Sequence, residues 1–107
     1  MTPFDPAQRL AQLTEEYLKR AEAIRRDLTS KRDADFAEQA QERQNEEVME
    51  ALLAEAEAEL REVALARQRL ADGHYGECQR CGEDIEGARL QALPATALCL
   101  RCAALKE

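Results

Sequence analysis

The feature that most constrains this chain is its set of four cysteines, which form two closely spaced pairs. Cys78 and Cys81 make one C-x2-C pair, and 17 residues later Cys99 and Cys102 make a second. Two cysteines three positions apart on a tight turn direct their sulfurs at one centre, and a second turn completes a tetrahedron around Zn2+. Gly82 follows Cys81, where a residue without Cβ accommodates positive φ. The pattern therefore predicts one structural zinc ion bound by the four cysteines.

Other uses of the cysteines fit the sequence less well. Thioredoxin-like redox chemistry requires a single C-x-x-C motif on a βαβ pattern, which is not visible here, and a disulfide framework is typical of secreted domains. Four thiolates leave no open position for a catalytic water, so we interpret the site as closed and structural. His74 precedes Cys78 by four residues, but the cysteines already fill the coordination shell, and we interpret it as a turn residue.

Composition restricts the class of partner. Only 4% of the 107 residues are aromatic and 35% are charged, so a single large core is not expected. The formal net charge is −7, and four negative thiolates with one doubly positive zinc ion would bring it to −9. A chain of this charge is repelled by phosphate backbones. We therefore expect no direct DNA binding and a protein partner with a basic surface.

The sequence also carries an expectation about location. Its first residues are neither basic nor apolar, which argues against a signal peptide, and no segment approaches the roughly 20 apolar residues of a membrane helix. Thiols held by a metal are typical of a reducing compartment. We expect a soluble, cytoplasmic monomer.

Two helical segments precede the cysteines. The first, over residues 7–29, follows a capping Asp5-Pro6 pair, and the second, over residues 34–71, contains neither glycine nor proline. Apolar residues recur every three or four positions in the first segment, at Leu10, Leu13, Tyr17, Ala21, Ile24 and Leu28. The second segment has a heptad seam with one polar interruption, at Met49, Leu53, Ala56, Leu60, Val63, Arg67 and Leu70. A polar tip at about residues 30–40 joins the two into an antiparallel coiled-coil hairpin.

The remaining residues predict a small module around the cysteines. Asp72-Gly73 supplies the C-cap of the second helix, and Ile85, Leu90 and Leu93 are the expected core. The predicted fold class is mostly α: a long antiparallel coiled-coil helical hairpin over residues 1–72, followed by a small four-cysteine zinc-finger module over residues 73–107 with a short C-terminal helix.

A specific run of residues surrounds the cysteines. It reads Y-G-E-C-Q-R-C-G over residues 75–82 and continues with Ile85, Arg89, Leu90, Ala92, Pro94 and the closing Cys99-Leu100-Arg101-Cys102. This run resembles the zinc-finger signature of the DksA/TraR family, and the acidic, alanine-rich hairpin before it is similar to the DksA coiled coil. The resemblance implies a bacterial transcription factor, not an enzyme, that acts on RNA polymerase.

The resemblance also implies a mode of action. Family members bind RNA polymerase directly, without contacting DNA, enter its secondary channel with the coiled coil and shorten the lifetime of open promoter complexes, as at ribosomal-RNA promoters in the stringent response. Their tip carries a D-x-x-D-x-A pattern, which is matched here by Asp35, Glu38 and Ala40 as D-x-x-E-x-A. Glu38 departs by keeping the charge on a longer side chain. Taken without the resemblance, these residues are equally typical of a solvated helix start, where acids favour the N-terminal dipole.

The alarmone ppGpp is a further expectation from the resemblance. In DksA, basic residues on the second helix help to bind it. Here residues 34–71 carry ten acidic side chains against four arginines, and Glu55, Ala58 and Glu62 stand at the aligned positions. Because an acidic surface repels a phosphorylated nucleotide, we expect weak or absent ppGpp synergy.

Three other functions remain open at this point. A Gre-like transcript cleavage factor would hold Mg2+ with tip carboxylates, but Gre proteins lack this zinc module. A nucleic-acid-binding zinc module would use Arg80, Arg89, Arg101 and Lys106, which lie beside many acids. A coiled-coil adaptor would have no special use for the polar tip.

Overall fold

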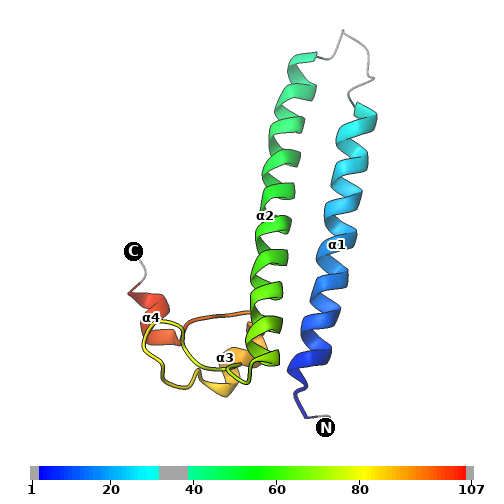
Figure 1. Cartoon of the computed structure of the whole chain (residues 1–107). Coiled ribbons are helices and arrows are strands. Elements are labelled where there is room, and N and C mark those ends of the chain that lie inside the picture. The colour runs from blue at the N-terminus through cyan, green and yellow to red at the C-terminus, as the bar shows by residue number, and fades with distance from the viewer. Residues whose placement is uncertain (1–2, 32–38, 106–107) are drawn as a thin grey trace. The chain divides into compact units, whose positions relative to one another are not determined.

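The computed structural model describes residues 3–31 and 39–105, with side chains described over residues 3–29 and 43–105. Four helices follow one another in these ranges: α1 (Pro6–Lys31), α2 (Gln39–Ala71), α3 (Gly87–Ala92) and α4 (Leu100–Ala104) (Figure 1). The described residues form no strand beyond an isolated antiparallel bridge between Glu77 and Asp84. Two long helices in contact and a following four-cysteine module confirm the predicted fold class. The predicted start of the second helix at residue 34 lies outside the described residues.

Local sequence signals explain where the long helices begin and end. The Asp5 side chain accepts a hydrogen bond from the Gln8 N–H at 3.3 Å, which confirms it as the N-cap of α1. At the end of α2, Gly73 adopts a φ of +80°, and the His74 N–H reaches back to the Arg69 carbonyl at 2.8 Å. These two features form a Schellman C-cap, as the Asp72-Gly73 pair predicts. No helix within the described ranges is long and apolar enough to cross a membrane.

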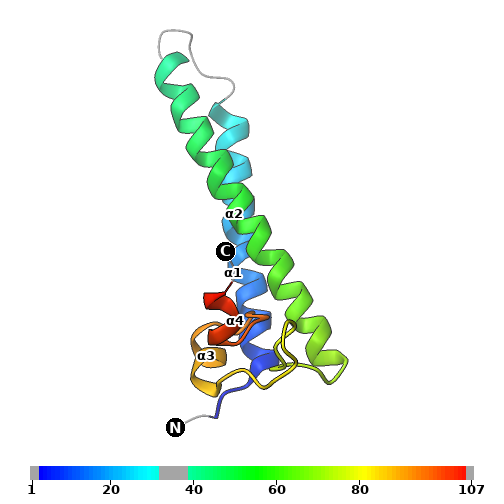
Figure 2. The same cartoon turned by 90° about the vertical axis from the view of Figure 1, so that its left-hand side faces the viewer.

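The chain separates by its contacts into two compact units, and the first, which we call the hairpin unit, spans residues 15–60. Within it, the second part of α1 and the first part of α2 lie side by side in opposite directions (Figures 1 and 2). Ala21, Ile24 and Leu28 of α1 and Ala56 of α2 are buried. Arg25 and Glu57 form an ion pair between the helices, with 3.2 Å between Nη2 and Oε2. The predicted apolar stripes therefore face each other here.

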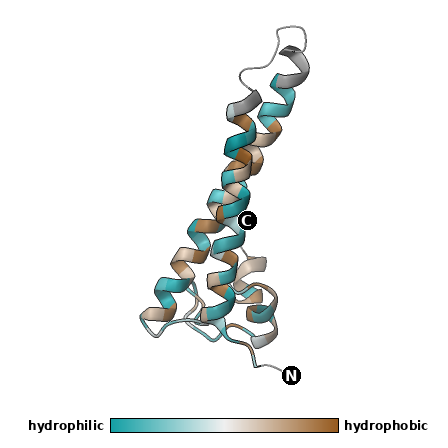
Figure 3. Cartoon of the chain, turned by 90° about the vertical axis from the view of Figure 1, so that its right-hand side faces the viewer, coloured by the Kyte–Doolittle hydropathy of each residue, from teal (hydrophilic) through white to brown (hydrophobic). Residues whose placement is uncertain are grey.

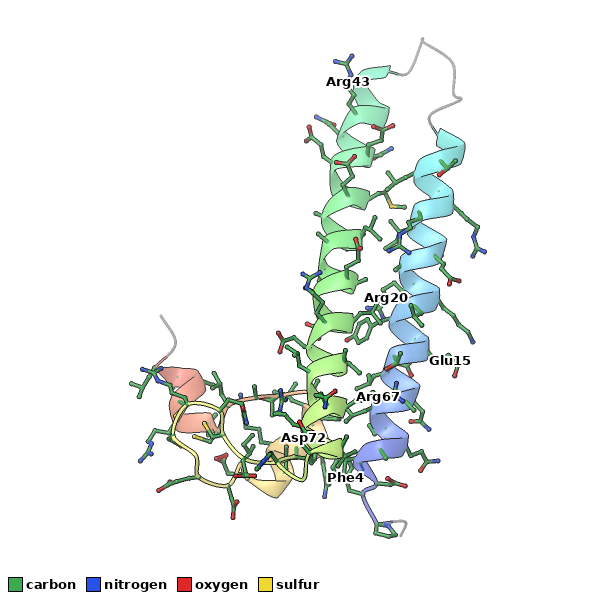
Figure 4. The ribbon with its side chains drawn as sticks, viewed as in Figure 1. Phe4, Glu15, Arg20, Arg43, Arg67 and Asp72 are labelled. Carbon is green, nitrogen blue, oxygen red and sulfur yellow. The ribbon has the colours of Figure 1, made fainter. Side chains whose placement is uncertain are left out.

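The second unit, which we call the cysteine unit, comprises residues 1–14 and 61–107. Leu10 of α1 is buried in this unit, as are Val63 and Ala66 of α2. Arg67, the polar interruption of the heptad seam, donates from Nη1 to Thr14 Oγ1 at 3.4 Å (Figure 4). The exposed guanidinium thus bonds to α1 at the edge of the seam. Figure 3 shows apolar positions recurring between polar ones along both long helices.

The core of the cysteine module is small. Ile85 and the buried cysteines form it, and Leu90 and Leu98 pack against it. The prediction that Leu93 belongs to this core is wrong, because its side chain is 50% exposed. Leu93 is the C-cap of α3, a helix without a buried residue, and the buried residue that follows is Pro94. Leu98 packs against the core instead.

The sequence-based boundary at residue 72 differs from the division by contacts, which falls within both long helices. The last turns of α2 belong to the same unit as the module, and Arg69 in these turns donates to the Ala95 carbonyl of the module. Residue 72 as the limit of two independent domains stays a prediction.

Candidate metal centre

The four cysteines converge on one point. Their sulfur atoms all lie within 4.8 Å of one another, and none of the four is in a disulfide. The Sγ atoms of Cys81 and Cys99 are 3.9 Å apart. In a tetrahedral site with Zn–S bonds of about 2.3 Å, the sulfurs are about 3.8 Å apart. The arrangement therefore fits a single zinc ion bound by thiolates.

The first pair lies on a tight turn in the segment between α2 and α3. The Gly82 N–H donates to the Cys78 carbonyl at 2.8 Å, and the Cys78 N–H donates to the Glu83 carbonyl at 2.8 Å. Gly82 has a φ of +78°, as predicted. A Cβ at this position would meet nothing within 4 Å, so the requirement for glycine comes from the backbone conformation and not from crowding.

The second pair is formed by the start of α4. Cys99 has extended backbone angles as the N-cap residue, and Cys102 lies within the helix and is buried. The Ala103 N–H donates to the Cys99 carbonyl at 2.9 Å, and the Gln79 N–H donates to the Ala97 carbonyl at 2.8 Å. The latter bond joins the first turn to the segment that leads into the second.

That leading segment, residues 94–98, is fixed by side chains from three other places. Tyr75 donates to the Pro94 carbonyl at 2.9 Å, and burial raises the pKa of its hydroxyl. Arg69, near the end of α2, donates to the carbonyl of Ala95 at 3.4 Å. Arg89 of α3 donates from Nε to the carbonyl of Leu98 at 2.9 Å. These three side chains hold the second pair of cysteines opposite the first.

The pKa values of Cys78 and Cys102 are shifted in opposite directions. Backbone N–H groups of Cys81 and Cys99 donate to the Cys78 sulfur and lower the pKa of that thiol to about 6 against the effect of burial. The pKa of the Cys102 thiol is raised to about 12, first by burial and then by hydrogen bonds to the neighbouring sulfurs. Because zinc binds the thiolate, the lowered pKa of Cys78 favours coordination and the raised pKa of Cys102 opposes it.

Polar side chains surround the exposed edge of the site. The neighbouring Cys81 thiol and the charge of Glu83 raise the pKa of the Arg101 guanidinium. Nη2 of Arg101 lies 3.8 Å from Oε2 of Glu83. His74 is engaged elsewhere, with its Nδ1 at 2.8 Å from Oε2 of Glu77. Arg89, considered above as a nucleic-acid contact, is instead bonded to the backbone of its own module.

The predicted tip residues belong to a different part of the chain. Asp35 and Glu38 lie outside the described residues, and Ala40 falls in the first turn of α2. Their role stays a prediction.

A helical hairpin followed by a module with four clustered cysteines defines a class of protein, the zinc-finger proteins with an N-terminal coiled coil. Two family models match the chain in this order. The DnaK suppressor protein-like N-terminal domain matches residues 7–70, and the prokaryotic dksA/traR C4-type zinc finger matches residues 73–107. The chain belongs to the DksA/TraR family. The predicted family and the predicted zinc cofactor are both confirmed.

Known proteins resemble this chain over most of its length. An uncharacterised protein of Aquifex aeolicus is 37% identical over 94 residues, which are 87% of this chain, and the chain spans 65% of that relative's length. The structure of transcription factor DksA2 from Pseudomonas aeruginosa is 29% identical with a TM-score of 0.84, over 92% of this chain and 78% of that one. The solution structure of DnaK suppressor protein from Agrobacterium tumefaciens is 31% identical with a TM-score of 0.51, over 89% and 91%. The chain has the fold and the two domains of a DksA-family transcription factor.

Proposed function

We propose that this protein regulates transcription initiation by binding RNA polymerase directly, without catalysing a reaction itself. In this proposal the hairpin tip enters the secondary channel and destabilises open promoter complexes. The observation that carries the proposal is the match to both family domains, in order, over residues 7–70 and 73–107. The TM-score of 0.84 to a solved transcription factor supports it.

Charge supports a protein target over a nucleic acid. The formal net charge of the chain is −7, and long-range repulsion from phosphates opposes binding to DNA or RNA. The arginines of the module that would offset this charge are partly engaged, since Arg69 and Arg89 donate to backbone carbonyls. An acidic hairpin instead complements a basic protein surface.

The proposed working residues are Asp35, Glu38 and Ala40, and the proposed zinc ligands are Cys78, Cys81, Cys99 and Cys102. Carboxylates brought close to the Mg2+ of a polymerase would act on the largest local charge in its active site. The zinc ion would have a structural role, since four thiolates leave no open coordination position.

Binding and competition test the proposal. Fluorescently labelled protein is titrated with purified bacterial RNA polymerase, and the complex is then challenged with a Gre-type cleavage factor, which also uses a hairpin. We expect saturable binding, displacement by the Gre factor, and no release of short RNA when this protein is added to backtracked complexes. Absence of binding would refute the proposal, and RNA release would assign the protein to the cleavage factors.

A further inference from the structure

Two side chains near the end of α2 reach the same stretch of the cysteine module. Arg69, in the last turn of the helix, donates from Nη2 to the carbonyls of Ala95 and Thr96 at 3.4 and 3.5 Å. Tyr75, just after the helix, donates from its hydroxyl to the Pro94 carbonyl at 2.9 Å. Three successive carbonyls therefore accept hydrogen bonds from the two sides of this helix end. We call Arg69 and Tyr75 the clasp.

The clasp lies on either side of the C-cap of α2. Gly73, between its two members, has a φ of +80°, and its N–H donates to the Leu70 carbonyl at 3.2 Å. The carbonyl of Arg69 accepts the capping hydrogen bond from the His74 N–H at 2.8 Å. Arg69 thus has two roles, since its backbone closes the helix while its side chain bonds to the module.

The stretch that the clasp contacts is also tied to both cysteine pairs. The Ala97 carbonyl accepts from the N–H of Gln79 at 2.8 Å, and Gln79 lies within the first pair. The stretch then leads into Cys99, the N-cap of α4 and the first residue of the second pair. Zinc bound by the four cysteines would fix both pairs, and with them the carbonyls that the clasp contacts.

We propose that the clasp couples zinc binding to the order of the last turn of α2, so that the zinc-loaded module holds this end of the long helix in its capped form. The coupling goes beyond polymerase binding and does not depend on it. The hydrogen bonds of the clasp are partly buried, so a lost donor leaves a carbonyl with restricted access to water. The short backbone between His74 and Cys78 is the competing route for such a coupling, and the test separates the two.

The test is hydrogen exchange at the amides of Gly73 and His74, measured by NMR on the full chain with and without zinc, under reducing conditions at fixed pH. In the parent, zinc is expected to slow this exchange at least about fivefold, the lower end of typical coupling between sites. In the double variant with Arg69→Gln and Tyr75→Phe, the ratio should fall to within about twofold of one. Zinc content and far-UV circular dichroism establish that each loaded sample is folded.

Arg67→Gln is the matched control. Arg67 lies on the same helix and donates to Thr14 of α1, so this variant removes an equal charge but no hydrogen bond of the clasp, and it should keep the parent ratio. A parent whose exchange does not respond to zinc would overturn the proposal. The full parent ratio in the double variant would also overturn it, since the backbone would then carry the coupling. If the double variant does not load zinc, Tyr75→Phe alone, which keeps the ring, decides: a reduced ratio supports the proposal and the parent ratio overturns it.

Discussion

Backbone conformation alone favours glycine at position 82, because Gly82 has a φ of +78° and a Cβ there would stand in open space. Gly82→Ala is expected to destabilise the zinc-loaded module by about 1–2 kcal/mol, the cost of a left-handed conformation in a residue with Cβ. Gly87, the first residue of α3, has equally open space and no positive φ, so Gly87→Ala should leave stability unchanged or slightly raised. Denaturant unfolding of the two zinc-loaded variants measures the difference, and equal losses would contradict this account.

The sequence indicates some residues of the site and not others. The cysteines and Gly82 are predictable because their roles depend on local spacing. Arg69 and Arg89 are not, because their partners are backbone carbonyls, as many as 27 residues away, which leave no pattern in the sequence. The sequence also does not indicate which leucine belongs to the core of the module. Leu93 and Leu98 are both apolar and close to the second cysteine pair, and only the packed structure shows that Leu98 contacts the core.

Arg89 is expected to hold the segment before the second cysteine pair. Arg89→Met keeps much of the aliphatic side chain but removes the hydrogen bonds to the Leu98 carbonyl and to Thr96 Oγ1. We expect a loss of about 1–3 kcal/mol and faster hydrogen exchange at the Gln79 amide, which donates to the Ala97 carbonyl. Arg80→Met is the exposed control. Unchanged exchange at Gln79 in both variants would show that Arg89 does not fix this segment.

At the scale of elements, α1 and α2 follow from periodicity. Most of their buried residues, among them Leu10, Ala21, Ala56 and Val63, belong to the predicted stripe and seam, but buried Ala66 does not. The heptad pattern succeeds because each helix has one partner, so a single apolar stripe is buried. The connection between the helices has no such pattern, and residues 32–38 of its predicted tip lie outside the described residues.

The acidic surface of α2 leads to a prediction about ppGpp. Glu55 and Glu62 are exposed on α2, with the partly exposed Ala58 between them. At spacings of three and four residues they share one face of the helix. Two carboxylates on this face should repel ppGpp, so the effect of this protein on open-complex lifetime should change less than about twofold when ppGpp is added. A strong synergistic response in the same transcription assay would refute this.

Loss of zinc should disrupt the cysteine module and leave the hairpin unit helical. The buried residues of the hairpin unit include no cysteine, whereas the core of the module is built from three of them. Cys99→Ser is therefore expected to remove zinc and expose the amides of Gly82 and Ile85 to exchange, with most of the helical circular dichroism retained. Ala104→Ser, at an exposed position of α4, is the control and should retain zinc. Complete loss of helix in Cys99→Ser would contradict this separation.

For the whole molecule, fold, family and cofactor could be predicted from the sequence because the cysteine spacing and the heptads are local and specific. The contacts that fix residues 94–98 required the structure. The mode of action depends on a partner, and its support comes from the family domains and from charge. Acidic residues alone do not separate a working tip from a solvated helix start, so the function of Asp35 must be measured.

The central claim is tested most directly by the half-life of open complexes on a ribosomal-RNA promoter, with purified polymerase and saturating amounts of this protein. The parent chain should shorten the half-life, and Asp35→Asn should restore it while still binding polymerase, because the tip carboxylate is lost. Glu50→Gln, an equal charge change at an exposed site on α2, should behave as the parent. A half-life that the parent leaves unchanged despite saturated binding would contradict the account.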